Sequence, residues 1–206
     1  MITILDYGAG NLRSVQRACR ALGMDSTVVQ TPEGLRNAER IIFPGVGAAP
    51  AAMDNLNRLG VVDALVEAVR SGVPTLGICV GAQVALDRSD EGDVKCIGLM
   101  AGDTRLFNLP DPALKVPHIG WNEVRVVRPH PLLEGLKQGD EFYFVHSYFL
   151  DPKSSDHVYS TTDYGSNFAS AIGQDNFFAT QFHPEKSGRF GLELLKRFAT
   201  WEGTPC

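Results

Sequence analysis

The segment at residues 73–86 constrains this chain more than any other. Its sequence, V-P-T-L-G-I-C-V-G-A-Q-V-A-L, predicts a short apolar strand over residues 73–78 and a helix over residues 80–86. Cys79 lies between them, with a glycine two residues away on each side. This spacing is typical of the sharp, strained turn that presents a nucleophile between a strand and a helix. The segment therefore predicts an α/β architecture and a candidate reactive thiol.

The position of Cys79 favours chemistry at its sulfur. At the N-terminus of a helix, the helix dipole and the unpaired N–H groups stabilise a thiolate. The backbone N–H of Val80 can bind an oxygen that becomes negative when the sulfur attacks a carbonyl carbon. A buried cysteine with only a packing role is the alternative, but the two flanking glycines favour the nucleophile.

The N-terminal half alternates strands with helices. We expect strands at residues 2–6, 26–30 and 40–43, and helices at 12–22, 50–59 and 61–70, the first of them capped by Asn11. This alternation predicts a doubly wound, mostly parallel central sheet flanked by helices. The third strand ends in P-G-V-G, residues 44–47. Because the carboxyl ends of parallel strands meet at one edge, this segment is expected beside Cys79.

The C-terminal half has a different pattern, with short strands and turns. We expect an additional mixed or antiparallel strand region there, with strands at residues 98–107, 122–128, 141–149, 158–162, 168–173 and 177–182. A helix at about residues 188–201 closes the chain. No linker divides the sequence, so residues 1–206 are interpreted as a single domain.

Composition excludes several classes of function. The formal net charge is −5, with no basic stripe, so we expect neither nucleic acid nor an anionic membrane as a partner. The chain lacks an export signal and a bilayer-length apolar run, and its scattered cysteines form no C-x-x-C pair; together these features predict a cytoplasmic protein. A dinucleotide fingerprint at Gly8 and Gly10 is incomplete because its third glycine position is Arg13. We therefore expect no cofactor.

A thiolate nucleophile needs a base held in place by a third group. His183 is the best candidate because it follows an apolar stretch in T-Q-F-H-P-E-K-S-G. Glu185 comes two residues later, on the same side if the backbone is extended, and Pro184 restricts the intervening backbone. A simple turn with a solvated carboxylate is the alternative. No further ligand cluster accompanies Cys79, His183 and Glu185, so we expect no metal site.

Taken together, these motifs resemble those of a known family. G-I-C-V-G-A-Q with the distant Q-F-H-P-E is similar to the class I (triad) glutamine amidotransferases, which hydrolyse glutamine to glutamate and pass the ammonia to a synthase. Five further stretches resemble one branch, the glutaminase subunits of imidazole glycerol phosphate synthases in histidine biosynthesis: D-Y-G-A-G-N-L-R-S-V, P-G-V-G, V-P-H-I-G-W-N, F-Y-F-V-H-S-Y and H-P-E-K-S-G. Val80 and Ala82 depart from the Leu and Met that are usual there, which affects local packing only.

The resemblance implies a role for each matching residue. Cys79 is the nucleophile, His183 the base and then the acid, and Glu185 the orienting carboxylate. Val80 N–H is one oxyanion donor, and Val46 or Gly47 supplies the other. The residues that match glutamine-binding positions are Gln83, Gly45, His146, Ser147 and Tyr148. For His146, a structural role within a strand remains an alternative.

The resemblance also implies a partner. It is a (β/α)-barrel cyclase that forms a heterodimer with this chain and joins the ammonia to a phosphoribulosyl formimino nucleotide, making imidazole glycerol phosphate and AICAR. The residues that match interface positions are Asn11, Trp121, Tyr143 and Lys186. We expect partner binding to reorganise P-G-V-G and turn a backbone N–H towards the oxyanion.

Three other functions remain compatible with the sequence. The chain could supply ammonia to a different synthase, such as one for pyridoxal phosphate. It could be a stand-alone cysteine hydrolase or peptidase with a similar turn. It could also be a binding module without catalysis, in which case Cys79→Ala would leave the activity of the assembly intact.

Overall fold

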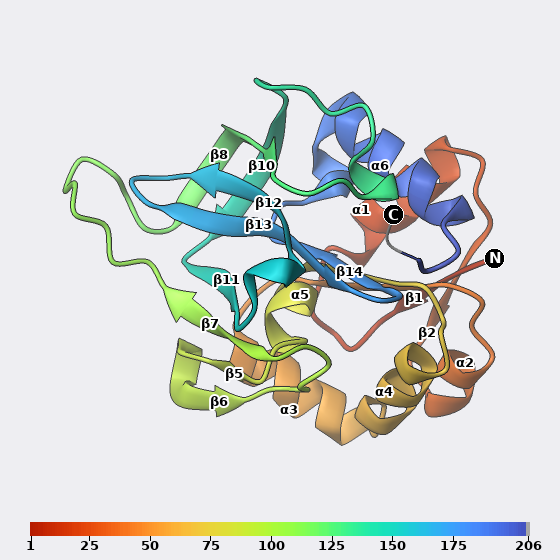
Figure 1. The fold of residues 1–206 in the computed structure, drawn as a ribbon. Coiled ribbons are helices and arrows are strands. Elements are labelled where there is room, and N and C mark those ends of the chain that lie inside the picture. The colour runs from red at the N-terminus through yellow and green to blue at the C-terminus, as the bar shows by residue number, and fades with distance from the viewer. Residues whose placement is uncertain (205–206) are drawn as a thin grey trace.

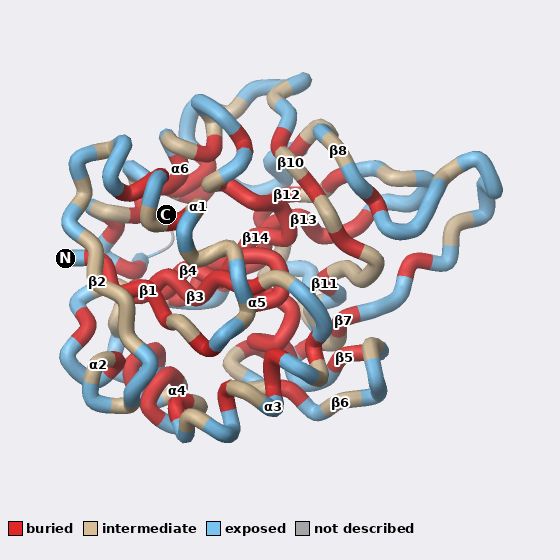
Figure 2. Tube along the Cα trace, turned by 180° about the vertical axis from the view of Figure 1, so that it is seen from behind, coloured by how far each residue is buried: buried red, intermediate tan, exposed pale blue. Residues whose placement is uncertain are grey.

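The centre of the fold is a parallel sheet. The computed structural model describes residues 1–204, and its central strands lie in the order β2 (Ser26–Val29), β1 (Ile2–Leu5), β3 (Ile41–Gly45), β4 (Thr75–Cys79) and β14 (Phe177–Thr180). Every residue of β1, β3, β4 and β14 is buried, whereas β2 at the edge is half-buried (Figure 2). Continuous apolar runs of this kind are expected for parallel strands covered on both faces.

Helices cover both faces of the parallel sheet (Figure 1). One face carries α1 (Leu12–Ala21) and α6 (Gly188–Thr200); the other carries α2 (Pro32–Arg36), α3 (Ala49–Leu59), α4 (Val62–Arg70) and the short α5 (Val80–Val84). The predicted doubly wound α/β fold is confirmed.

The predicted antiparallel region extends the same sheet. Beyond β14 the order continues with β13 (Asn167–Gln174), β11 (Tyr148–Pro152), β7 (Gly102–Leu106), β5 (Arg88–Ser89) and β6 (Val94–Lys95). β12 (Val158–Asp163) pairs with β13 and with β9 (Arg125–Val126). A separate antiparallel ribbon joins β8 (His118–Glu123) to β10 (Glu141–His146). The 3-10 turns are η1 (Glu91–Asp93), η2 (Pro131–Leu133), η3 (Ser155–His157) and η4 (Pro184–Lys186).

Several boundaries differ from the predictions. The single strand expected at residues 141–149 is two strands that separate at Ser147, because β10 pairs with β8 whereas β11 pairs with β7 in the main sheet. The strand expected at 122–128 begins earlier, at His118, and is interrupted after Glu123. Helix α2 was not predicted, although Pro32 occupies its first turn and the Thr31 hydroxyl accepts a hydrogen bond from Gly34 N–H at 3.3 Å.

The described cysteines Cys19, Cys79 and Cys96 form no disulfide, and Cys206 lies outside the described residues. No helix within residues 1–204 combines the length and the apolar character needed to cross a bilayer.

Candidate active site

Cys79 lies at a strained turn between β4 and α5. Its backbone angles are φ 53° and ψ −110°, a region that non-glycine residues rarely occupy and that is common at functional sites. Gly81 is required by packing, since an added Cβ would overlap the carbonyl oxygen of Phe43. A Cβ on Gly77 would lie only 3.0 Å from the Cβ of Ala179 on the neighbouring strand. The glycine spacing thus lets β3 and β14 approach the turn closely.

The P-G-V-G segment lies beside the thiol, as expected from the order of the strands. Gly45 at the end of β3 is the register partner of Cys79 at the end of β4. The backbone N–H of Val46, however, donates a hydrogen bond to the carbonyl oxygen of Ala9 at 3.0 Å. That N–H is therefore committed to the segment after β1 in this conformation.

His183 and Glu185 form a buried pair just beyond β14. Nδ1 of His183 lies 2.8 Å from Oε1 of Glu185, and both side chains are 0% exposed. The backbone between them is the 3-10 turn η4 rather than the extended segment that we expected, so the contact arises from the turn. His183 N–H donates to the carbonyl oxygen of Tyr143 at 2.9 Å, and Ser187 Oγ donates to the carbonyl oxygen of His183 at 2.6 Å. These bonds fix the backbone that carries the imidazole.

The surroundings of His183 favour its protonated form. Burial alone would lower its pKa, but the nearby Cys79 and then Glu185 outweigh burial and raise the pKa to about 10. Nδ1 is engaged by Glu185, whereas Nε2 is buried without a hydrogen-bond partner among residues 1–204. The imidazole thus has one nitrogen held by the carboxylate and the other available for proton transfer.

Asn11 supports this pair, a role that we did not predict. It occupies the N-cap position of α1, as expected, with φ 62°, but its side chain makes no capping hydrogen bond. Its Nδ2 instead donates to Oε1 of Glu185 and lies 3.3 Å from Nδ1 of His183. Because 172 residues separate Asn11 from His183, no local pattern could have indicated this contact.

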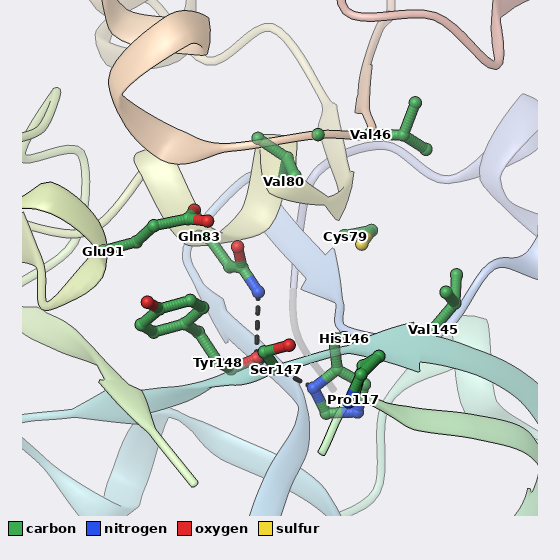
Figure 3. Close-up of a pocket in the computed structure, with 11 residues that line it drawn as sticks. Val46, Cys79, Val80, Gln83, Glu91, Pro117, Val145, His146, Ser147 and Tyr148 are labelled. Atoms are coloured by element: carbon green, nitrogen blue, oxygen red, sulfur yellow. Dashed lines mark hydrogen bonds between the residues drawn. The ribbon is translucent and has the colours of Figure 1, made fainter.

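A pocket of about 250 Å³ opens at Cys79 (Figure 3). Its lining includes most of the expected site residues and one carboxylate that we did not predict, Glu91; the full set is Val46, Gly47, Cys79, Val80, Gln83, Glu91, Pro117, Val145, His146, Ser147 and Tyr148. Gly45 does not line the pocket and lies behind it, against Tyr7 and the first turn of α5. Glu91 also accepts a hydrogen bond from Ala49 N–H at 2.7 Å, which fixes its carboxylate at the start of α3.

Two buried glutamines connect the pocket wall to the sulfur. Gln83 Nε2 donates to the carbonyl oxygen of Tyr148 at 3.0 Å and lies 3.2 Å from Oε1 of Gln181 (the first bond is drawn in Figure 3). Because the Oε1 atom of Gln181 faces Gln83, its Nε2 atom faces Cys79 and donates to Sγ at 3.8 Å. Gln181 was not predicted; it is completely buried and lies two residues before His183.

His146 uses both ring nitrogens within the protein. Nδ1 donates to the Tyr148 carbonyl oxygen at 2.8 Å, and Nε2 lies 3.1 Å from Nδ1 of His118. Asn122 Nδ2 in turn lies 3.3 Å from Nε2 of His118. Burial is the main reason that the pKa of His146 falls to about 3 and that of His118 to about 4, so both rings are neutral. The imidazole of His146 therefore holds the wall of the pocket, which favours the structural alternative for this residue.

Three of the four residues expected at a partner interface lie in one row next to the triad: the exposed Trp121 and Lys186, with the half-buried Tyr143 between them. The fourth, Asn11, is half-buried and contacts Glu185 instead. Trp121 is 51% exposed, and its ring centroid lies 6.2 Å from that of Tyr143. Lys186 Nζ lies 5.7 Å from the centre of the same tyrosine ring, which is 6.5 Å from the ring of His183. The row therefore borders the catalytic histidine candidate.

Within residues 1–204, no group of three or more His, Cys, Asp or Glu side chains is arranged to hold a metal ion. The arrangement around the pocket is that of a thiol, an imidazole and a carboxylate for nucleophilic attack on a carbonyl group.

Known proteins are similar to this chain in sequence and in fold. A family model described as "Glutamine amidotransferase class-I" matches residues 3–200. The imidazole glycerol phosphate synthase subunit HisH of Nitrosococcus oceani is 45% identical over 205 residues, which cover 98% of each chain. The HisH subunit of Dechloromonas aromatica is 46% identical over 209 residues, covering 98% of this chain and 96% of its own.

Solved structures agree on the fold. A crystal structure described as a glutamine amidotransferase has a TM-score of 0.74 at 18% identity and covers 97% of this chain and 99% of its own. A chain in the structure of PurLQS from Thermotoga maritima has a TM-score of 0.73 at 17% identity, covering 97% of this chain and 97% of its own. The family expected from the motifs is confirmed. The chain belongs to the class I glutamine amidotransferases and, among them, to the HisH subunits of imidazole glycerol phosphate synthase.

Proposed function

We propose that this chain hydrolyses glutamine to glutamate and ammonia with Cys79, His183 and Glu185, and delivers the ammonia to a cyclase partner. The observation that carries the proposal is the buried His183–Glu185 pair beside a strained Cys79 whose sulfur faces a pocket (Figure 3). An enzyme of this kind needs a cysteine sulfur, an imidazole and a cavity the size of an amino acid, and Cys79, His183 and the pocket at the carboxyl ends of β4 and β14 support this proposal.

The reaction proceeds in two halves. The Cys79 thiolate attacks the side-chain amide carbon of glutamine, and the carbonyl oxygen becomes negative in the tetrahedral intermediate. His183 gives its proton to the nitrogen as the C–N bond breaks, releasing ammonia and leaving a glutamyl thioester. His183 then takes a proton from water, whose oxygen attacks the thioester, and glutamate leaves as the thiolate re-forms. Glu185 stabilises the charged imidazole throughout.

The pocket offers complementary groups for the rest of glutamine. Glu91 is the one acidic residue in its described lining and suits the α-ammonium group. Gln83 and the Ser147–Tyr148 segment suit the polar atoms of the α-carboxylate and the amide. Gly45 contributes indirectly, because it permits close packing of the oxyanion segment against α5.

The isolated chain is a poor glutaminase in this proposal. Val80 N–H, at the start of α5, is one oxyanion donor, but Val46 N–H is bound to Ala9. One missing donor costs about 2.7–4 kcal/mol in the barrier, or about 10²–10³ in kcat. Partner binding breaks the bond between Val46 and Ala9 and turns the N–H towards the oxyanion; Gly47, already at φ 101°, gives the segment the necessary freedom.

The partner in this proposal is a (β/α)-barrel cyclase that forms a cytoplasmic heterodimer with this chain and completes a lyase reaction yielding imidazole glycerol phosphate and AICAR. The names of the HisH relatives support a multi-subunit synthase. The exposed Trp121 and Ile119, at 51% and 60%, lie two residues apart on β8 and so share one side of the strand. An apolar surface of this kind, with Tyr143 and Lys186 beside it, is typical of a docking site.

The test is glutamate release from glutamine by this chain, measured with and without the barrel cyclase and its nucleotide. We expect slow release by the chain alone and an increase of about 10² or more in the complex. Cys79→Ala should abolish release in both. Equal rates with and without the partner would contradict the gating by Val46, and activity of Cys79→Ala would contradict the triad.

A further inference from the structure

Tyr7 carries a buried hydroxyl group that the mechanism above does not use. The residue is 1% exposed, and its hydroxyl oxygen has no hydrogen-bond partner among residues 1–204. Burial, and to a smaller extent the nearby Cys79, raises the pKa of Tyr7 far above its ordinary value. The group is therefore a neutral hydroxyl that can donate. A buried donor without an acceptor is unfavourable and calls for an explanation.

The hydroxyl lies against the segment that carries the oxyanion donor. A Cβ added to Gly45 would overlap the Tyr7 hydroxyl oxygen, and would also lie 3.0 Å from both Gly81 N and Val80 Cβ. The Tyr7 ring packs on Phe43 of β3, with ring centroids 5.4 Å apart. The hydroxyl is thus held between the end of β3 and the first turn of α5.

Activation requires rotation of the peptide group that joins Gly45 to Val46. The N–H and C=O of a planar trans peptide point in opposite directions, so turning Val46 N–H towards the pocket turns the Gly45 carbonyl the other way. That carbonyl oxygen then faces the Ala9 oxygen that had accepted the N–H. Two acceptors facing each other need a donor nearby. Tyr7, two residues before Ala9, already presents an unpartnered hydroxyl at Gly45.

The geometry points to Tyr7 as a positioning residue whose hydroxyl donates to the rotated Gly45 carbonyl and so holds Val46 N–H on the oxyanion. This inference rests on the proposed function, because it presupposes glutamine hydrolysis and a partner that rotates the peptide. In the resting conformation the hydroxyl makes no described hydrogen bond, so the new bond stabilises the rotated conformation alone. Tyr7 does not touch the substrate and acts through Val46.

Tyr7→Phe tests the inference in the complex with the barrel cyclase and its nucleotide. The change removes the hydroxyl and leaves the ring on Phe43. We expect kcat for glutamate release to fall about tenfold, with KM for glutamine within about twofold of the wild type. The Tm of the chain without its partner should not decrease, because the resting conformation loses no described hydrogen bond. Tyr164→Phe is the matched control: its hydroxyl donates to the Lys115 carbonyl at 2.9 Å in an exposed region, and kcat should not change.

A second readout separates the oxyanion from the thiol. Iodoacetamide forms a C–S bond to Cys79 with loss of iodide and creates no oxyanion, so it needs no backbone donor. Tyr7→Phe should therefore be alkylated at the wild-type rate while it turns over glutamine more slowly. An unchanged kcat, a parallel loss of alkylation, or a lower Tm of the variant chain without its partner would each overturn the inference. If the wild-type complex itself releases no glutamate, the proposed function is wrong. If the wild type is active and Tyr7→Phe is equally active, only the inference about Tyr7 is wrong, so the two failures can be told apart.

Discussion

Replacing Glu185 by glutamine tests the electrostatic part of the triad with little change in shape. The side chain of Glu185 is completely buried, and its Oε1 accepts hydrogen bonds from Nδ1 of His183 and from Nδ2 of Asn11. Glutamine has nearly the same volume and keeps a carbonyl oxygen for these donors. Glu185→Gln therefore removes the negative charge beside the imidazole while largely preserving the packing around it.

The expected loss of kcat can be calculated from the hydrogen bond between Glu185 and His183. This bond, unlike the one to Asn11, becomes stronger when the imidazole is charged. A hydrogen bond to a charged group contributes about 1.5–3 kcal/mol. Losing that contribution when the imidazole must carry a proton should lower kcat by about 10-fold to 150-fold. Burial opposes protonation of His183, and Cys79 and Glu185 together outweigh it, so the pKa of His183 should fall in the variant.

The assay is glutamate release by the complex at saturating glutamine over pH 6–10. Glu193→Gln is the matched control, because Glu193 is exposed on α6 and the chemical change is the same. We expect the control to retain wild-type kcat and both variants to keep a wild-type Tm within a few degrees. A Glu185→Gln kcat within twofold of the wild type, with an unshifted pH profile, would refute the argument that this carboxylate stabilises the charged imidazole.

Three further predictions concern other parts of the molecule. Gln181→Met should slow iodoacetamide alkylation of Cys79 several-fold, because it removes the N–H that lies 3.8 Å from the sulfur; an unchanged rate would contradict a role for this contact. Gly81→Ala should cost about 1–3 kcal/mol, because its Cβ overlaps the Phe43 carbonyl, and should lower the Tm in a thermal melt by about 2–12 °C. The free energy of unfolding should fall as the pH drops from about 6.5 towards 4, because burial lowers the pKa values of three histidines: His118, His130 and His146. Each of them should contribute up to about 1.4 kcal/mol per pH unit. The sign follows because the unfolded chain binds protons in this range that the folded chain excludes; urea unfolding at several pH values should show a smaller slope for His130→Asn.

Local patterns predicted most of the fold because its central strands are short apolar runs with turn signals at both ends. The turn at Cys79 was predictable for the same kind of reason, since the glycine spacing is a direct requirement of close packing. The break at Ser147 was not, because residues 141–149 form one β-rich run in the sequence and only the pairing partners divide it into two sheets. Helix α2 was missed although Thr31 and Pro32 carry recognisable start signals.

The site residues that escaped prediction share a physical reason. Glu91 and Gln181 were not predicted, and Asn11 was expected at an interface rather than on the His183–Glu185 pair. All three act through contacts between segments far apart in the chain, and each belongs to a residue type that is common on surfaces. Gln181 could have been suspected, because a glutamine in an otherwise apolar run just before His183 must find buried partners. Glu91 lies in a turn among other acidic residues, and nothing in that pattern distinguishes it from a solvated carboxylate.

The segment after β1 contacts both parts of the proposed catalytic site. The Ala9 carbonyl accepts a hydrogen bond from Val46 N–H, and two residues later the Asn11 side chain contacts the His183–Glu185 pair. Gly8 and Gly10, at φ 81° and 69°, flank Ala9 with conformations that favour glycine, so the path of this segment is specific. A partner that contacts Asn11 and shifts this segment by about an ångström would break the bond between Ala9 and Val46, because hydrogen bonds weaken steeply beyond normal length. The same shift would move a support of the proton carrier. In the proposed mechanism, one displacement of the Y-G-A-G-N segment therefore changes both the oxyanion donor and the imidazole, although this segment is far from Cys79 in the chain.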